Sequence, residues 1–509
     1  MKFSFTFIFL LFSINFSYAK AEVITKVKKP EIKKPKTTKK KEKKIVAKQR
    51  IQCNMTVTYK KRPKKVDDFT KILSEGILYG RIRSNTFLFD GGPDDVSHYA
   101  VGLGGNLTYK SARYKGFSFT TGLYTSLNPN HVQADEIGDY RYGKDTFSRH
   151  AVATEDRDAM LALTENYLSF KKSRVELKVG RFLLETFLLK SHDTKMIPNA
   201  FEGANLRIRT IPNTRIQLAY ITKQKLRDHE SFHRVLAYND DTTNPYAKWT
   251  GNDDGAMHQG LTYSKLDAKG IDDRILVFET KNNSIENTTL KVGYTAVPDL
   301  VSSIVLEGSY KYKLANGLKI KPAILYMQQF DDGAGAIGGA NLKNNTTGYS
   351  NPNNLDNAII SSRLDFIYGN GSLRFGYTDV QDGGDIIAPW HAQPTAGYTR
   401  AMSRMNWFAN TKTTMFRADY DLSKAGIVDG LRVMTRYAMQ DFDDNKPGTT
   451  ADLNVFTFDV VKRFKENPNL LMKLRTGFVT EDHKVANLDG SFKKDPSYNA
   501  VRLEMNYLF

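Results

Sequence analysis

The chain ends in the segment Val501-Arg-Leu-Glu-Met-Asn-Tyr-Leu-Phe509, in which apolar residues alternate with mostly polar ones. Successive side chains of an extended strand point to opposite faces, so the odd-numbered apolar residues would share one face and Arg502, Glu504 and Asn506 would lie on the other. One apolar face and one wet face are typical of a strand in a closed transmembrane sheet. The segment therefore predicts an outer-membrane β-barrel.

The same alternation recurs along most of the chain after Gly76. Between Tyr99 and Tyr109, for example, apolar residues fall on one face and small or polar residues on the other, with an aromatic residue at each end. A helix would scatter these positions over all its faces. The pattern predicts eighteen strands, near residues 76–89, 97–109, 116–127, 163–171, 174–182, 203–211, 215–223, 273–282, 288–296, 301–314, 317–330, 357–368, 371–379, 413–422, 430–440, 452–464, 470–482 and 497–509. A barrel of this all-β class would enclose an aqueous channel, whereas eight strands would be filled by side chains.

Short polar connections such as Pro212-Asn-Thr214 and Gly369-Asn-Gly371 alternate with long loops. The long loops lie near residues 128–160, 183–202, 224–270, 331–356 and 380–412. Short turns at one rim and long loops at the other are typical of an outer-membrane barrel, with the short turns on the periplasmic side. One segment stays open, because Met257–Leu266 could form a strand of its own.

The first residues have the pattern of a signal peptide. A charged start, Met1-Lys2, precedes an apolar run and then the small residues Ala19 and Ala21. The run is too short to span a bilayer, so residues 1–21 are predicted to be removed on export. No later apolar stretch reaches about 18 residues, which argues against a helical membrane protein.

Most of the formal charge of +19 lies in one segment. Residues 20–65 contain 19 Lys and Arg against three acidic residues, a net charge of +16. Because this segment also contains Pro and almost no aromatics, we expect residues 22–66 to be disordered or extended and the barrel to occupy residues 67–509. Two roles remain open for residues 22–65: a solvated periplasmic spacer, or a contact with peptidoglycan or anionic lipid head groups. Nucleic acid is not expected as a partner of an exported chain.

Cys53 is the single cysteine. It cannot form an internal disulfide, and it does not lie at the signal cleavage site, where lipidation would require it. We interpret it as incidental, with an intermolecular disulfide as the alternative.

Two adjoining stretches carry a resemblance to a known family. Val179-Gly-Arg-Phe182 and His192-Asp-Thr-Lys-Met-Ile-Pro198-Asn-Ala-Phe201-Glu-Gly203 are similar to the strand ending in Gly-Arg, the inward-folding loop and the Pro-x-x-Phe-Glu-Gly return of OprD-type outer-membrane porins. A looser resemblance extends from about Gly76 to Phe509. It implies an eighteen-stranded pore constricted by its third extracellular loop (183–202), a wall of basic residues that guides carboxylates, and a terminal Phe read by the barrel-insertion machinery. The Lys/Pro-rich segment is not part of the family pattern.

Arginines recur at the positions opposite to the lipid-facing residues. Charges are hydrated in a wet lumen, whereas an outward Arg at the bilayer midplane would cost about 2–4 kcal/mol. Facing acids such as Glu176, Glu307, Asp365 and Asp419 would create a transverse field that orients a solute, or would only pair across the wall and make it rigid. The predicted pore-lining residues are Arg81, Arg83, Arg207, Arg209, Arg363, Arg374, Arg417, Arg432, Arg436 and Arg475.

The loop at residues 183–202 supplies the candidates for a constriction. They are Lys190, His192, Asp193 and Lys195, with Glu202 at the return of the loop. Charged groups that converge in a narrow section act as an electrostatic filter.

Three other sequence patterns resemble metal-, nucleotide- or cation-binding sites. His229-Glu-Ser-Phe-His233 matches a zinc-binding H-E-x-x-H, but it follows a strand in a polar loop and no third ligand follows at the usual spacing, so no metal is predicted. Gly333-Ala-Gly-Ala-Ile-Gly338 matches a nucleotide-binding G-x-G-x-x-G, and we interpret it as a flexible loop. Acid pairs such as Asp443-Asp444 could attract cations or bridge lipopolysaccharide, or could simply solvate a loop.

The sequence therefore predicts an outer-membrane porin that lets small polar, carboxylate-bearing solutes diffuse passively, with no catalytic residues and no cofactor. Its expected surroundings are outer-membrane lipids and lipopolysaccharide, and either a monomer or a homotrimer fits. Two other readings are an anchor or adhesin that grips the cell wall through its basic segment, and a hydrolase with its chemistry at the barrel rim. The histidines that a hydrolase needs mostly lie apart in different loops.

Overall fold

The computed structural model describes residues 49–52, 55–59, 63–92, 96–140, 146–240, 257–402, 405–487 and 489–509. The predicted signal peptide, the basic segment up to residue 48, and Cys53 lie outside the described residues. All elements named below belong to one compact unit, Ile45–Phe509.

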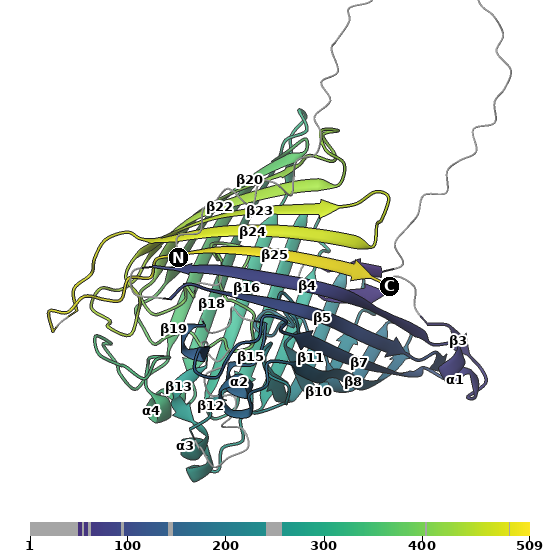
Figure 1. The fold of residues 1–509 in the computed structure, drawn as a ribbon, viewed down its shortest axis with the longest axis horizontal. Coiled ribbons are helices and arrows are strands. Elements are labelled where there is room, and N and C mark those ends of the chain that lie inside the picture. The colour runs from purple at the N-terminus through teal and green to yellow at the C-terminus, as the bar shows by residue number, and fades with distance from the viewer. Residues whose placement is uncertain are drawn as a thin grey trace, which may run out of the picture. The chain divides into compact units, whose positions relative to one another are not determined.

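Eighteen long antiparallel strands close into a barrel in this part of the chain (Figure 1). They are β4 (Ile77–Gly91), β5 (His98–Lys110), β7 (Phe117–Leu127), β8 (Met160–Lys172), β9 (Val175–Phe182), β10 (Ala200–Ile208), β11 (Thr214–Lys225), β14 (Ile275–Asn282), β15 (Thr288–Val297), β16 (Val301–Tyr310), β18 (Lys319–Asp331), β19 (Asn357–Tyr368), β20 (Gly371–Val380), β21 (Lys412–Asp421), β22 (Leu431–Asp441), β23 (Leu453–Arg463), β24 (Leu470–Glu481) and β25 (Tyr498–Leu508). Each strand pairs with the next, and β25 closes the barrel against β4, with Leu508 opposite Arg81. The predicted fold class is confirmed.

The barrel carries apolar side chains on its outer face and polar ones on its inner face. In β4, Leu78 and Ile82 are 60% and 62% exposed, whereas the intervening Arg81 and the following Arg83 are each only 1% exposed. This inversion of a soluble protein's pattern is typical of a barrel whose outside meets hydrocarbon. It explains why a strict alternation along the sequence was enough to locate the strands.

Short connections lie at the end of the barrel where the chain terminates, here called the short-turn end (Figure 1). The turn between β19 and β20 has only two residues, and its first, Gly369, takes φ +53°, a left-handed conformation that glycine adopts without strain. Small elements border this end: β3 (Lys65–Val66), β6 (Arg113–Tyr114), β17 (Tyr312–Lys313) and α1 (Lys71–Ser74).

The loops at the other end contain short elements of their own. They are η3 (Ile137–Asp139), α2 (Arg149–Glu155), β12 (Ala237–Tyr238), β13 (His258–Thr262), α3 (Tyr263–Ala268) and α4 (Ala334–Gly338). None of the described helices is long and apolar enough to cross a membrane.

These loop elements settle one open alternative and correct one expectation. Part of Met257–Leu266 forms a strand of its own, β13, which pairs in parallel with β12 outside the barrel and is followed by α3. The G-x-G-x-x-G segment forms the short helix α4 rather than a flexible loop, and the Asp331 carboxylate accepts hydrogen bonds from the N–H groups of Gly333 and Gly335.

Two further differences concern the edges of strands. β10 begins at Ala200, three residues before the predicted start, because Phe201 and Glu202 pair with Phe182 and Arg181 of β9. Residues 49–59, expected in the extended segment 22–66, instead include a hairpin of β1 (Gln49–Ile51) and β2 (Val57–Tyr59).

Candidate functional site

The loop between β9 and β10, residues 183–199, folds into the barrel interior. The Asp193 carboxylate accepts hydrogen bonds from Arg81 and, at 2.8 Å, from Arg83, both on β4. On the other side of the loop, the N–H of Phe187 donates to the Glu279 carboxylate on β14. The strands β4 and β14 lie on opposite sides of the β9–β10 pair. The loop is therefore tied to two separate parts of the inner wall.

The Asp193 contact is completely buried. The side chains of Arg81 and Arg83 have no exposed surface and that of Asp193 has 1%. Arg83 also binds Glu504 of β25 at 2.7 Å. Glu504 also binds Arg502 at 3.1 Å, so three cations share two carboxylates and each buried charge has a partner of opposite sign, which is the condition for holding charges out of water.

His192, next to Asp193, turns the loop but adds no charge to it. It takes φ +26°, and the N–H of Thr194 donates to its carbonyl at 2.8 Å. Burial, together with the nearby Arg227 and Arg400, holds the pKa of the His192 imidazole well below its ordinary value. The imidazole is therefore neutral at neutral pH.

Arginines of neighbouring strands lie opposite one another on the inner wall. Arg374 of β20 pairs in register with Arg417 of β21, which pairs with Arg436 of β22. Arg475 of β24 lies opposite Arg502 of β25. We call this set of five residues the arginine wall.

Carboxylates fix the direction of most of these guanidinium groups. Asp365 binds Arg374, and Asp459 binds Arg475 at 2.6 Å. Asp419 binds Arg417 at 2.6 Å and is shared with Arg432 at 3.2 Å. Bidentate pairs of this kind restrict the guanidinium to one plane.

Two arginines form no ion pair with an acid. Among the residues that the structure describes, no carboxylate lies within ion-pair distance of Arg436, on the wall, or of Arg400, in the loop between β20 and β21. Arg400 is half-buried close to Arg475, Arg436 and Arg227, and desolvation followed by these neighbouring cations lowers its pKa. The arginine wall and its two loop neighbours, Arg227 and Arg400, therefore hold a local excess of positive charge.

The loop between β20 and β21 is held on the wall by two of the predicted residues. Arg363 and Arg374 both donate to the carbonyl of Gly397, at 2.8 and 2.7 Å. The N–H of Lys190, in the loop at 183–199, donates to the carbonyl of Trp390. The two loops therefore meet inside the barrel, beside the arginine wall.

Other predicted residues lie apart from this group. Arg207 of β10 is opposite Glu176 of β9, whereas Arg209 is exposed beyond the end of β10. Glu202 pairs with Arg181 at 2.8 Å. The Lys195 ammonium lies 5.7 Å from the centre of the Phe87 ring.

Sequence reasoning did not select Arg227, Arg400 or Arg502. The first two lie in long loops, where no periodicity marks the direction of a side chain. Arg502 stands in the terminal strand opposite the apolar face, so the alternation that predicted the strand could also have selected this residue.

A cavity of about 360 Å³ separates the inward loop from another part of the wall. Charged residues of both signs line it: Glu185 and Lys190 from the loop, and Arg215, Glu279, Lys281, Lys291, Glu307 and Arg363 from the wall. Lys291 binds Glu307 at 2.7 Å. We call Arg215, Glu279, Lys291 and Glu307 the mixed wall. The space suits a small organic solute.

The H-E-x-x-H segment does not present two ligands to a metal. The Nδ1 of His229 and the Nε2 of His233 are hydrogen-bonded to each other at 2.8 Å, and the Nδ1 of His233 contacts the carbonyl of Arg234. The segment lies outside every described helix. Burial lowers the pKa of His233 to about 4, so this imidazole is neutral.

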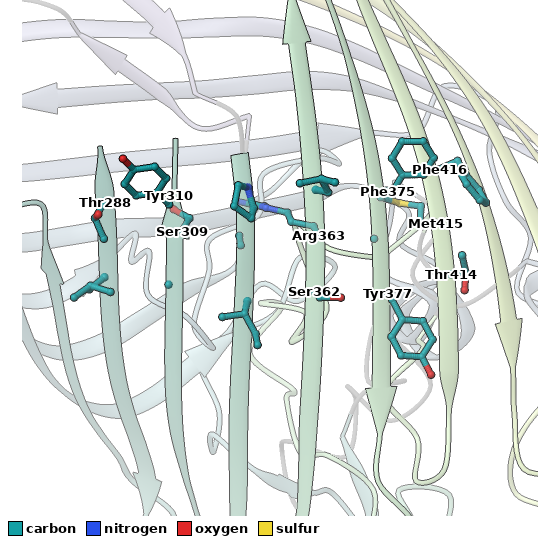
Figure 2. A pocket seen from close by; sticks show the side chains of 17 residues that line it. Thr288, Ser309, Tyr310, Ser362, Arg363, Phe375, Tyr377, Thr414, Met415 and Phe416 are labelled. Atoms are coloured by element: carbon teal, nitrogen blue, oxygen red, sulfur yellow. The ribbon is translucent and has the colours of Figure 1, made fainter. Parts of the chain in front are cut away.

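A second groove lies on the outer face of strands β15 to β21 (Figure 2). Its apolar lining includes Leu290, Ile324, Phe375 and Phe416, which are exposed side chains of the hydrocarbon-facing surface. Gly308 leaves the space between them. This groove is separate from the charged interior.

The chain matches the family model described as outer membrane porin, OprD family, over residues 141–452. Similar solved structures include OccAB3 of Acinetobacter baumannii (18% identity, TM-score 0.65) and OccK1 (OpdK) of Pseudomonas aeruginosa (15% identity, TM-score 0.63). Each alignment covers 86% of this chain and 99% of the other, and at such identities the likeness is one of fold. A search of curated proteins gives no match. With an inward loop, a closed eighteen-stranded barrel and a family model that covers more than half of its length, this chain belongs to the OprD family of outer membrane porins.

Proposed function

We propose that the chain is a channel through which small polar solutes that carry a carboxylate diffuse passively across the outer membrane. In this proposal the loop at 183–199 narrows the channel, and the arginine wall with Arg400 attracts the carboxylate. No catalytic step, cofactor or metal is part of it, and residues 22–66 lie on the periplasmic side. Both a monomer and a homotrimer are compatible with it.

The observation that carries the proposal is the uncompensated positive charge beside the inward loop. Arg436 and Arg400 have no carboxylate partner among the described residues, and Arg475 lies near both. A cluster of cations in a narrow, partly dehydrated section attracts anions and repels cations. Because the neighbouring arginines are held by Asp365, Asp419 and Asp459, the wall keeps its shape while a solute passes.

Two solved structures of the same fold support a carboxylate as the solute. One is OpdK with vanillate (14% identity) and the other OccK2 (OpdF) in complex with glucuronate (16% identity), both from Pseudomonas aeruginosa. The names of both molecules denote carboxylate anions. Their identities to this chain are too low to carry over a particular solute.

The test is single-channel conductance of the refolded protein in a planar bilayer, with the reversal potential measured across a KCl gradient. We expect discrete openings, a preference for chloride over potassium, and block by millimolar dicarboxylates. Arg436→Gln should move the reversal potential toward zero, and Arg209→Gln, at the exposed end of β10, is the matched control.

Folded protein that inserts and never conducts would overturn the channel. A channel that prefers potassium, or that is indifferent to Arg436→Gln, would overturn the role of the arginine wall.

A further inference from the structure

The β1–β2 hairpin lies apart from the barrel sheet and has an apolar face. Gln49 pairs with Tyr59 and Ile51 with Val57, and the N–H of Met55 donates to the carbonyl of Gln52 at 3.0 Å. Ile51, Met55 and Val57 are buried, whereas Arg50 is exposed. A two-stranded hairpin alone is marginally stable in water, so this one depends on the surface against which it packs.

That surface is the inner wall of the barrel at the short-turn end. The apolar face of the hairpin clusters with Tyr79 of β4, Leu471 of β24 and Leu508 of β25, and the rings of Tyr59 and Tyr79 are 5.5 Å apart. Tyr79 and Leu508 point inward, because their neighbours Leu78 and Tyr507 are exposed on the outer face.

Polar contacts fix the hairpin at this place. The side-chain amide of Gln49 donates to the carbonyl of Phe509, the last residue of the chain. The carbonyl of Met55 accepts a hydrogen bond of 2.7 Å from Nη1 of Arg81. This carbonyl lies on the inner side of the wall, since the Arg81 guanidinium is completely buried there.

Arg81 also connects the hairpin to the inward loop. Its guanidinium donates to Met55 with one nitrogen and to Asp193 with the other. Asp193 in turn is the anchor of the loop at 183–199 on β4. The Arg81 side chain therefore joins the hairpin at the short-turn end to the loop at 183–199.

The hairpin is not needed to close the barrel. β25 and β4 pair directly from Tyr498–Gly91 to Leu508–Arg81, without any residue of the hairpin. Only residues 60–64 separate β2 from β3. A displaced hairpin therefore stays close to the inner wall against which it packs, at a high effective concentration.

We propose that the inner wall around Tyr79, Leu471 and Leu508 is a docking site for the chain's own β1–β2 hairpin, which acts there as a displaceable stopper of the channel. This inference rests on the proposed function, because a stopper has meaning only in a channel that conducts. The docked hairpin narrows the short-turn end and, through Arg81, holds the loop at 183–199 in place. Its release widens the exit and leaves one N–H group of Arg81 free.

The experiment compares unit conductance in planar bilayers for three forms of the mature protein. The first lacks residues 22–59, and the second carries Ile51→Asp and Val57→Asp, which place two charges against the apolar seat. The third, Arg50→Ala, changes the exposed face of the same hairpin and is the control. Each form must first be shown to be folded, by the compact, heat-sensitive mobility of a closed barrel on detergent gels.

The axes of two adjacent strands lie about 5 Å apart, and with its side chains the hairpin occupies roughly twice that width of the channel. Its removal should widen the short-turn end, so we expect unit conductance to rise roughly twofold in the first two forms. Arg50→Ala should conduct like the wild type. Unchanged or lower conductance in the folded truncation and in the double variant would overturn the stopper. In that case a chloride-selective wild-type channel would still support the proposed function. A folded wild type that never conducts would overturn both.

Discussion

The arginine wall and the mixed wall line the same barrel but treat charge differently. On the mixed wall, Lys291 binds Glu307, and Glu279 lies near the cations Lys190 and Arg215, so both acids there have cationic neighbours. On the arginine wall, acids hold Arg374, Arg417 and Arg475, but Arg436 and the adjacent Arg400 have none among the described residues. From this difference we expect selectivity to depend on the unpaired charges of the arginine wall, and the paired ones to keep the wall in shape.

The largest effect is expected from Asp193→Asn, which removes the anchor between the inward loop and β4. Two buried guanidinium groups would lose a charged partner, a change that costs about 3 kcal/mol or more. Thermal unfolding of the refolded barrel should shift down clearly, and single-channel recordings should become noisy as the loop moves. Asp272→Asn, whose carboxylate is exposed, is the control and should change neither. A quiet, equally stable Asp193→Asn channel would contradict the anchor.

A smaller effect separates the two walls directly. Arg436→Gln removes an unpaired charge, and we expect the chloride-to-potassium permeability ratio to fall by roughly fivefold. Lys291→Gln removes one half of a balanced pair on the mixed wall, where roughly a twofold change is expected because the mixed charges already cancel part of the field. Reversal potentials in a KCl gradient measure both. Equal shifts in the two variants would show that pairing does not matter.

The loop arginine provides a further test, because a guanidinium stays protonated in proteins and Arg400 therefore adds a fixed positive charge. Arg400→Gln should weaken chloride selectivity at neutral pH, as measured by the reversal potential in a KCl gradient. If the variant and the wild type give the same reversal potential, Arg400 does not contribute.

The smallest effect is expected at Arg209, which sequence reasoning grouped with the pore-lining residues. This side chain is exposed beyond β10, where water and salt screen it. Arg209→Gln should leave the permeability ratio within error of the wild type. A shift as large as that of Arg436→Gln would place the selective section at the short-turn end instead.

The two-residue periodicity predicted the barrel because alternating apolar and polar residues mark the outer and inner faces of each strand. The predicted strands near 357–368 and 470–482 agree with β19 and β24 to within one residue. Arg81 and Asp193 were both chosen as candidates, but their contact joins positions 112 residues apart and depends on how a loop folds inward. Arg400 could not be found in this way, because an irregular loop has no faces to alternate. The hairpin was missed for another reason: Ile51 and Val57 stand in a basic segment whose composition predicts disorder.

The seat of the hairpin also sets an order of assembly. It is made of Tyr79 on the first long strand together with Leu471, Leu508 and Phe509 on the last two, so it exists only after the barrel has closed. The hairpin is synthesised before any barrel strand and yet must be the last part to dock. Until then its apolar face has no docking surface in the barrel, so we expect the hairpin to stay undocked while the barrel is unfinished.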